Sequence, residues 1–133
     1  MDDSATLRVS YCENFDDTGL DLSNPLIIID IISGGCKIHW IISDMNTRDI
    51  LIWRDIEESV DATGTISKVF GGGENSFWRC QCTEDYFRFR YEISGSGGGS
   101  IFMVDIPKAV MKGCIGKIIK VLECAARGEK YQD

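Results

Sequence analysis

The sequence predicts one α+β domain, an antiparallel β-meander of about seven or eight strands with a single C-terminal helix packed on one sheet face. Three observations support this fold class. Apolar and polar residues alternate through most of the first hundred positions, glycine-rich stretches separate the alternating runs, and the apolar period changes after Pro107. A chain of 133 residues with 44% hydrophobic residues can bury a core as one domain, residues 1–133.

Short runs with β-strand patterning follow one another along the chain. The first alternates Leu7, Val9 and Tyr11 with polar residues, which is typical of a strand with one wet face. Pro25 precedes a β-branched run at 26–32 that is typical of a central strand. The other predicted strands are 36–43, 50–53, 65–70, 77–83, 86–94 and 101–106, with polar or glycine-rich turns between them.

The C-terminal segment has a helical period. Pro107 suits the first turn of a helix, and Gly128 suits its C-terminal end. Since an antiparallel sheet needs only one buried face, the sheet face opposite this helix is expected to be open for binding. The expected apolar stripe of the helix consists of Met111, Cys114, Ile115, Ile118, Leu122 and Ala125.

The charge of the chain narrows the classes of partner. The net charge is −7, so we expect no nucleic acid and no anionic membrane surface as a partner, because both need clustered Lys and Arg. Residues 1–30 hold seven acids against Arg8 alone. Like charges repel one another within a folded domain, so this distribution favours either solubility or a cationic protein partner.

The compartment predicted for the chain is the cytoplasm. The first residues are acidic where a secretory leader is basic, and the longest apolar run, 26–32, contains Asp30 and is too short for a membrane span. In a reducing compartment we expect cysteines to be thiols that fill apolar positions. The six are Cys12, Cys36, Cys80, Cys82, Cys114 and Cys124.

The sequence offers weak signals for catalysis or for a cofactor. Runs 71–73 and 95–99 are glycine-rich but join strands, whereas a phosphate loop leads into a helix. Cys80 and Cys82 share one strand face, but Cys36 and His39 should point to opposite faces, so these groups do not form a convincing zinc site. His39 is the only histidine and lies in a strand. We therefore predict no catalytic residue, no metal ligand and no cofactor.

Two features point instead to protein binding. Adjacent aromatic and apolar residues such as Phe77 and Trp78 cannot share a sheet face, so some large apolar side chains should be exposed or covered by a partner. Two acidic segments also contain apolar residues, Phe15 and Ile56. The predicted partner-binding residues are the acids of these segments and one apolar anchor: Asp16, Asp17, Asp21, Trp53, Asp55, Glu57, Glu58 and Asp61.

The function predicted from the sequence is that of a small acidic inhibitor or immunity-type protein, which neutralises a basic toxin or nuclease by occlusion. One alternative is a chaperone or assembly subunit that binds a hydrophobic segment and depends on Trp40 or Trp53. A second alternative is a small metal-dependent or ligand-binding enzyme that uses His39 and the cysteines. A homodimer that pairs its uncovered sheet face is compatible with all three.

Overall fold

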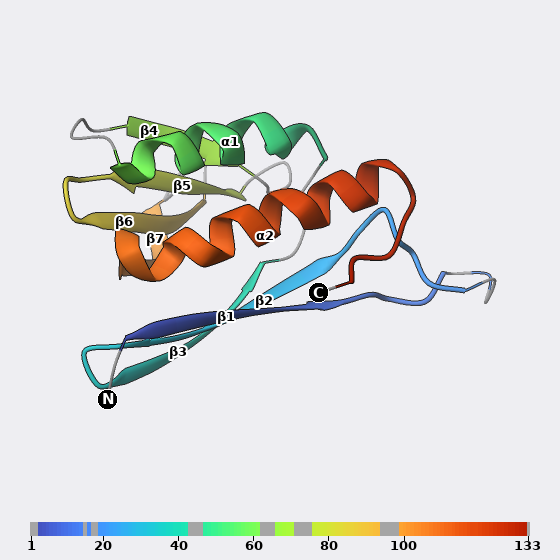
Figure 1. The fold of residues 1–133 in the computed structure, drawn as a ribbon, viewed down its shortest axis with the longest axis horizontal. Helices are drawn as coiled ribbons and strands as arrows, with labels where there is room; N and C mark the ends of the chain where they lie inside the picture. The colour runs from blue at the N-terminus through green and yellow to red at the C-terminus, as the bar shows by residue number, and fades with distance from the viewer. Residues whose placement is uncertain are drawn as a thin grey trace.

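The computed structural model describes residues 3–14, 16, 19–42, 47–61, 66–70, 76–93 and 99–132. Within these residues the chain forms two antiparallel sheets, with strand orders β1-β2-β3 and β4-β5-β6-β7, and two α-helices (Figure 1). The α+β class is confirmed, but the single meander of seven or eight strands is wrong. A helix follows the third strand, and the chain starts a second sheet after that helix.

The first sheet has one apolar face. Leu7, Ile29 and Trp40 lie in register across its strands, and all three are buried. Gly34 and Gly35 form the β2–β3 turn with φ values of 59° and 79°, a left-handed conformation that glycine adopts without steric strain. The strands of this sheet are β1 (Ser4–Ser10), β2 (Leu26–Ser33) and β3 (Cys36–Ile42).

The second sheet also alternates a buried and a wetter face. Cys80 and Cys82 share one strand face, as predicted, because residues two apart in a strand point the same way, and Trp78 lies on the same buried inner face. The strands are β4 (Ile66–Phe70), β5 (Ser76–Cys82), β6 (Tyr86–Ile93) and β7 (Gly99–Pro107).

A helix, α1 (Ile50–Glu58), replaces the strand predicted at 50–53. That prediction is wrong because four consecutive apolar residues fit either period, whereas Trp53, Ile56 and Val60 are spaced three and four apart, as on a helix. The acidic run after Trp53 is therefore part of a helix instead of a loop. Short 3-10 helices, η1 (Thr47–Asp49) and η2 (Ser59–Asp61), extend α1 at its two ends.

The predicted C-terminal helix is confirmed as α2 (Lys108–Ala126). Pro107 precedes its first turn, and all six residues of the predicted apolar stripe are buried. Gly128 ends the helix with φ of 67°, and its N–H donates a hydrogen bond to the Ala125 carbonyl at 3.1 Å.

The helices pack beside each other, and α2 lies between α1 and the first sheet (Figure 1). They contact β4 and β7 of the second sheet, and α2 also lies against β1 of the first (Figure 1). They run antiparallel, because Arg54 pairs with Glu123 whereas Glu57 lies beside Gly116. This arrangement covers the inner face of the second sheet and leaves its outer face uncovered by either helix.

Aromatic rings join these layers. Trp40 from β3 and Trp53 from α1 both contact Phe89 in β6, with ring centroids 4.7 and 6.1 Å apart. Trp40 also contacts Trp78 in β5, at 5.1 Å between centroids. The two sheets and α1 therefore share one continuous core.

The expectation of exposed large apolar residues is confirmed. Trp40 is 2% exposed, while its neighbour Ile41 is 48% exposed on the opposite sheet face. Among the described residues, the exposed large apolar side chains are Leu20, Ile41, Leu51, Val69, Tyr86, Ile93, Phe102 and Met103. No described helix has both the length and the apolar character needed to cross a membrane. The glycine runs 71–73 and 95–98 lie outside the described residues.

The aromatic core predicts that substitutions on the buried side of α1 lower the free energy of unfolding much more than substitutions on its exposed side. Trp53→Ala removes a fully buried ring from contact with Phe70 and Phe89, so it should lower the free energy of unfolding by about 3–5 kcal/mol. Leu51→Ala, on the exposed side of the same helix, should change it by less than about 1 kcal/mol. Urea unfolding of the two variants measures both values, and equal losses would contradict the assigned burial.

Candidate protein-binding surface

The outer side of α1 is the first part of the candidate surface. Because Trp53 and Ile56 face the core, the polar residues of the helix face outward. The helix begins with apolar residues and has no acid in its first turn. Its polar residues are Arg54, Asp55, Glu57 and Glu58, and all four are exposed.

Two of these side chains have ion-pair partners. Asp55 Oδ2 lies 3.2 Å from Lys68 Nζ, and Arg54 Nη2 lies 3.8 Å from Glu123 Oε2. No ion pair or hydrogen bond joins the carboxylates of Glu57 and Glu58 to another described residue. Within the described chain, these two carboxylates are therefore the acidic groups of α1 that form no ion pair.

The position of Glu57 and Glu58 on α1 is unfavourable for the isolated protein. Both lie in the last turn, which holds no basic residue, and a helix C-terminus carries a negative partial charge. A charge of the wrong sign at a helix end costs roughly 0.3–1 kcal/mol when it is exposed. These two carboxylates therefore do not stabilise the helix that holds them.

A groove runs between the C-terminal half of α1 and the middle of α2. Its volume is about 370 Å³. A methyl group added at Gly116 would lie 3.6 Å from Glu57 Oε2, an ordinary van der Waals contact, so the Glu57 carboxylate lies directly over α2 at this position. The groove lining combines three acids with two bases, one aliphatic side chain and one glycine: Glu57, Glu58, Glu123, Arg54, Lys120, Ile119 and Gly116.

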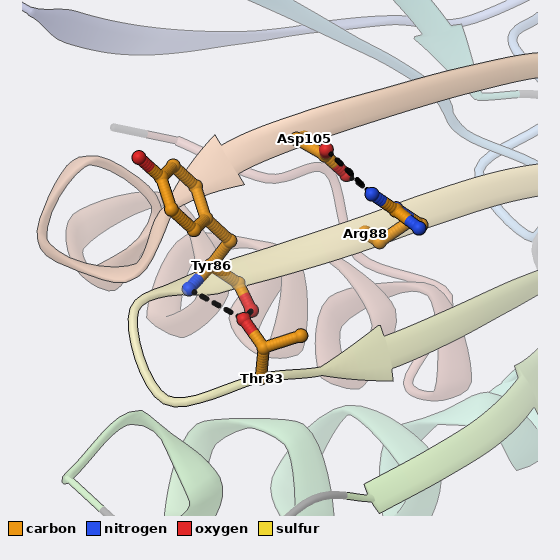
Figure 2. A network of polar contacts seen from close by, with 4 residues as sticks. All are labelled: Thr83, Tyr86, Arg88 and Asp105. Atoms are coloured by element: carbon orange, nitrogen blue, oxygen red, sulfur yellow. Dashed lines mark hydrogen bonds and ion pairs between the residues drawn. The ribbon is translucent and has the colours of Figure 1, made fainter.

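The β5–β6 turn brings two more acids to the same end of the molecule. Cys82 Sγ, at the end of β5, lies 3.9 Å from the Ser59 carbonyl, which directly follows α1. Thr83 and Tyr86 close the turn through hydrogen bonds of 2.9 and 3.1 Å (Figure 2). The exposed Glu84 and Asp85 occupy the turn between them. We call the four residues Glu57, Glu58, Glu84 and Asp85 the acidic edge.

The other predicted acids do not join this edge. Asp16 and Asp21 belong to the β1–β2 connection, which lies at the far end of the molecule from the C-terminal end of α1 (Figure 1). Asp21 accepts hydrogen bonds from the N–H and the hydroxyl of Ser23, at 3.1 and 2.6 Å. Its side chain therefore stabilises the local conformation of the β1–β2 connection. Asp17 lies outside the described residues, and only the backbone of Asp61 is described.

Trp53 does not lie on the surface. It was predicted as an exposed apolar anchor on the assumption of a strand, but it is 0% exposed on the inner side of α1. Glu84 and Asp85 fall in one of the polar turns expected between strands and were not among the predicted binding residues. Their proximity to α1 depends on the pairing of β5 with β6 beside that helix, for which local sequence carries no signal.

His39 and the cysteines do not converge. His39 lies on the outer face of the first sheet, whereas Cys80 and Cys82 are buried in the second sheet. Burial raises the pKa of the Cys80 thiol, which makes it a poor nucleophile at neutral pH. Among the described residues, no group of three or more metal-binding side chains is close enough to hold an ion.

The partner of His39 is Asp30. His39 Nδ1 lies 2.5 Å from Asp30 Oδ1, and Arg8 Nη2 lies 3.3 Å from Asp30 Oδ2. The hydrogen bond with His39 is the main cause that lowers the pKa of Asp30, and the charges of His39 and Arg8 act in the same direction. This cluster organises a sheet face but presents no nucleophile.

Comparison with known proteins gives no functional assignment. No family model matches the sequence, and searches of the curated proteins and of the solved structures find no match. The candidate surface therefore depends on the geometry and charge described above.

The lowered pKa of Asp30 predicts a pH-dependent contribution to stability. Because the pKa in the folded state lies below the ordinary value of 3.8, ionised Asp30 stabilises the fold above that value. This contribution is lost as the pH falls through the folded-state pKa. Asp30→Asn should be less stable than the unmodified protein near neutral pH, and the difference should close in acid. Urea unfolding across this range measures it, and a difference independent of pH would contradict the assignment.

Proposed function

We propose that this protein is an inhibitor or immunity-type protein that binds a cationic toxin or nuclease and occludes its active surface. The observation that carries the proposal is the pair Glu57 and Glu58, two exposed carboxylates at the negative end of α1 that form no ion pair with another described residue. A cationic partner would relieve their mutual repulsion and their opposition to the helix dipole. Binding would thus recover free energy that the isolated protein lacks.

The groove between α1 and α2 suits a long basic side chain. Glu57, Glu58 and Glu123 supply carboxylates, and Ile119 supplies an apolar contact for the methylene groups of a lysine or arginine. Lys120 and Arg54 at the same groove would reject partners with a different arrangement of charge. The rest of the acidic edge extends the negative surface around the groove.

Electrostatic complementarity of this kind acts mainly on the rate and the specificity of association. Acidic surfaces guide a basic partner through the solvent, and the effect weakens as salt screens the charges. For an inhibitor this is the useful property, because a toxin must be captured before it acts. We propose the cytoplasm as the compartment, where exposed thiols such as Cys12 and Cys36 stay reduced.

Charge reversal at the acidic edge tests the proposal. Glu57→Lys/Glu58→Lys should reduce the rate constant of association with a basic toxin or nuclease partner by at least about tenfold at low salt. The salt dependence of that rate constant should also become flatter. Stopped-flow mixing over a range of salt concentrations measures both.

The matched control is Glu13→Lys/Asp16→Lys, which makes the same change in net charge at the far end of the molecule. It should have a clearly smaller effect on the rate constant. Equal effects of the two double variants would show that only net charge matters and would remove the acidic edge from the proposal. No binding of any basic partner would remove the proposed function itself.

The alternative function is that of a chaperone or assembly subunit that binds a hydrophobic segment. One observation favours it: Ile28 and Ile41 are paired across β2 and β3 on the outer face of the first sheet, and Ile41 is 48% exposed. The anchors first considered for this function, Trp40 and Trp53, are both buried.

Ile41→Asp distinguishes the two functions. For a chaperone, it should abolish binding of an unfolded hydrophobic peptide and leave the salt dependence unchanged, since the contact is apolar. For an inhibitor that uses the acidic edge, it should leave association with the basic partner unchanged. Binding assays with both ligands on the same variant give the answer, and loss of inhibitor binding alone would contradict both assignments.

A further inference from the structure

The outer face of the second sheet is positively charged in a chain whose net charge is −7. Three arginines lie on this face, and Val69, Arg79, Arg90 and Met103 form one row across all four strands. Val69 and Met103 are 41% and 53% exposed at the two ends of the row. We call Val69, Arg79, Arg88, Arg90 and Met103 the arginine face.

Two of the arginines each form an ion pair with one carboxylate. Arg88 binds Asp105 through two hydrogen bonds, of 2.7 and 3.0 Å, on neighbouring strands (Figure 2). The hydrogen bond from Arg88 is the main cause that lowers the pKa of Asp105. Arg79 Nε lies 3.2 Å from Glu92 Oε1 in the same way.

Arg90 is different. It lies directly opposite Arg79 in the β5–β6 register, and like charges in directly opposed positions destabilise a sheet. Its buried Nε has no hydrogen-bond partner, and its charge acts on Asp105, a carboxylate that Arg88 already binds. The arginine face therefore holds three guanidinium groups against two carboxylates, and Arg90 lies next to the exposed Met103.

The outer side of α1 supplies the complementary groups. Leu51 is 68% exposed, and Glu58, seven residues later on the same side of the helix, forms no ion pair with another described residue. Seven residues span about 10.5 Å along an α-helix. Val69 and Arg90 are two strands apart, which is about 10 Å across a sheet. The spacing of the apolar group and the charge is thus similar on both surfaces.

We propose that the arginine face binds α1 of a second copy of this chain, with Glu58 of that copy on Arg90 and its Leu51 on Val69. Within one molecule the helix covers the inner face of the sheet, so its outer side and the arginine face point in opposite directions. The contact is therefore head to tail, and further copies can add to both ends. A second copy fits better than a polyanion, because Glu92 and Asp105 on the same face would repel a chain of phosphates.

This inference does not depend on the proposed function, because its test contains only this protein. Glu58 belongs to both surfaces, so a cationic partner would compete with the second copy for α1. Failure of self-association would leave the inhibitor proposal intact, and the absence of a cationic partner would leave the self-association intact.

Sedimentation equilibrium of the full chain tests the contact. The unmodified protein should self-associate beyond a dimer as its concentration rises, and added salt should weaken the association. Glu58→Arg and Arg90→Glu should each raise the dissociation constant by at least about tenfold. An equimolar mixture of the two variants should regain association, because the intact Arg90 and Glu58 meet in one contact and the two substituted positions carry opposite charges in the other.

A charge-matched variant away from the proposed contact serves as the control. Lys130→Glu makes the same charge change as Arg90→Glu at an exposed C-terminal position and should leave self-association unchanged. If Arg90→Glu fails to fold by circular dichroism, Val69→Asp removes the apolar half of the same contact. A protein that stays monomeric up to about 1 mM overturns the proposal. So does a variant mixture that does not associate, or a monomer whose arginine face binds heparin.

Discussion

The contact of three aromatic rings at Phe89 is the constraint on which the rest of the structure depends. Trp40 reaches Phe89 from the first sheet, and Trp53 reaches it from α1. Three elements that are distant in sequence are thereby fixed relative to one another. With Trp53 inside, Glu58 must be outside, and with Phe89 inside, Arg88 and Arg90 must lie on the opposite face of β6. Both binding surfaces follow from this one packing arrangement.

The same packing leaves polar groups unsatisfied, but the apolar area that it buries contributes more free energy than these groups cost. The indole Nε1 atoms of Trp40 and Trp53 are buried without a hydrogen-bond partner, which costs about 1–3 kcal/mol for each. A buried tryptophan removes about 150–250 Å² from water, which contributes roughly 4–6 kcal/mol. The apolar burial therefore outweighs the unsatisfied donors, and an aromatic cluster can hold the layers together without a polar network.

Local patterns predicted the elements better than their arrangement. The alternation in β6 and the stripe of α2 were clear because each has one period over many residues. Residues 50–53 were wrongly predicted as a strand, because four consecutive apolar positions show neither a strand period nor a helix period. The helical spacing becomes visible only with Ile56, which lies in a run whose acidic residues are typical of a loop. The division into two sheets follows from that helix. The contact of Cys82 with Ser59 at the end of α1, and the position of Arg79 opposite Arg90, depend on strand pairing, which single residues do not encode.

The charged groups of this molecule thus lie on opposite sides of one core. Carboxylates lie at the C-terminal end of α1, and guanidinium groups lie on the outer face of the second sheet. Hydrogen–deuterium exchange of the protein bound to its cationic partner tests the central claim that α1 is the binding element. The account predicts slower exchange at the C-terminal end of α1, in η2 and in the β5–β6 turn. Protection confined to β1–β3, with α1 unchanged, would contradict it.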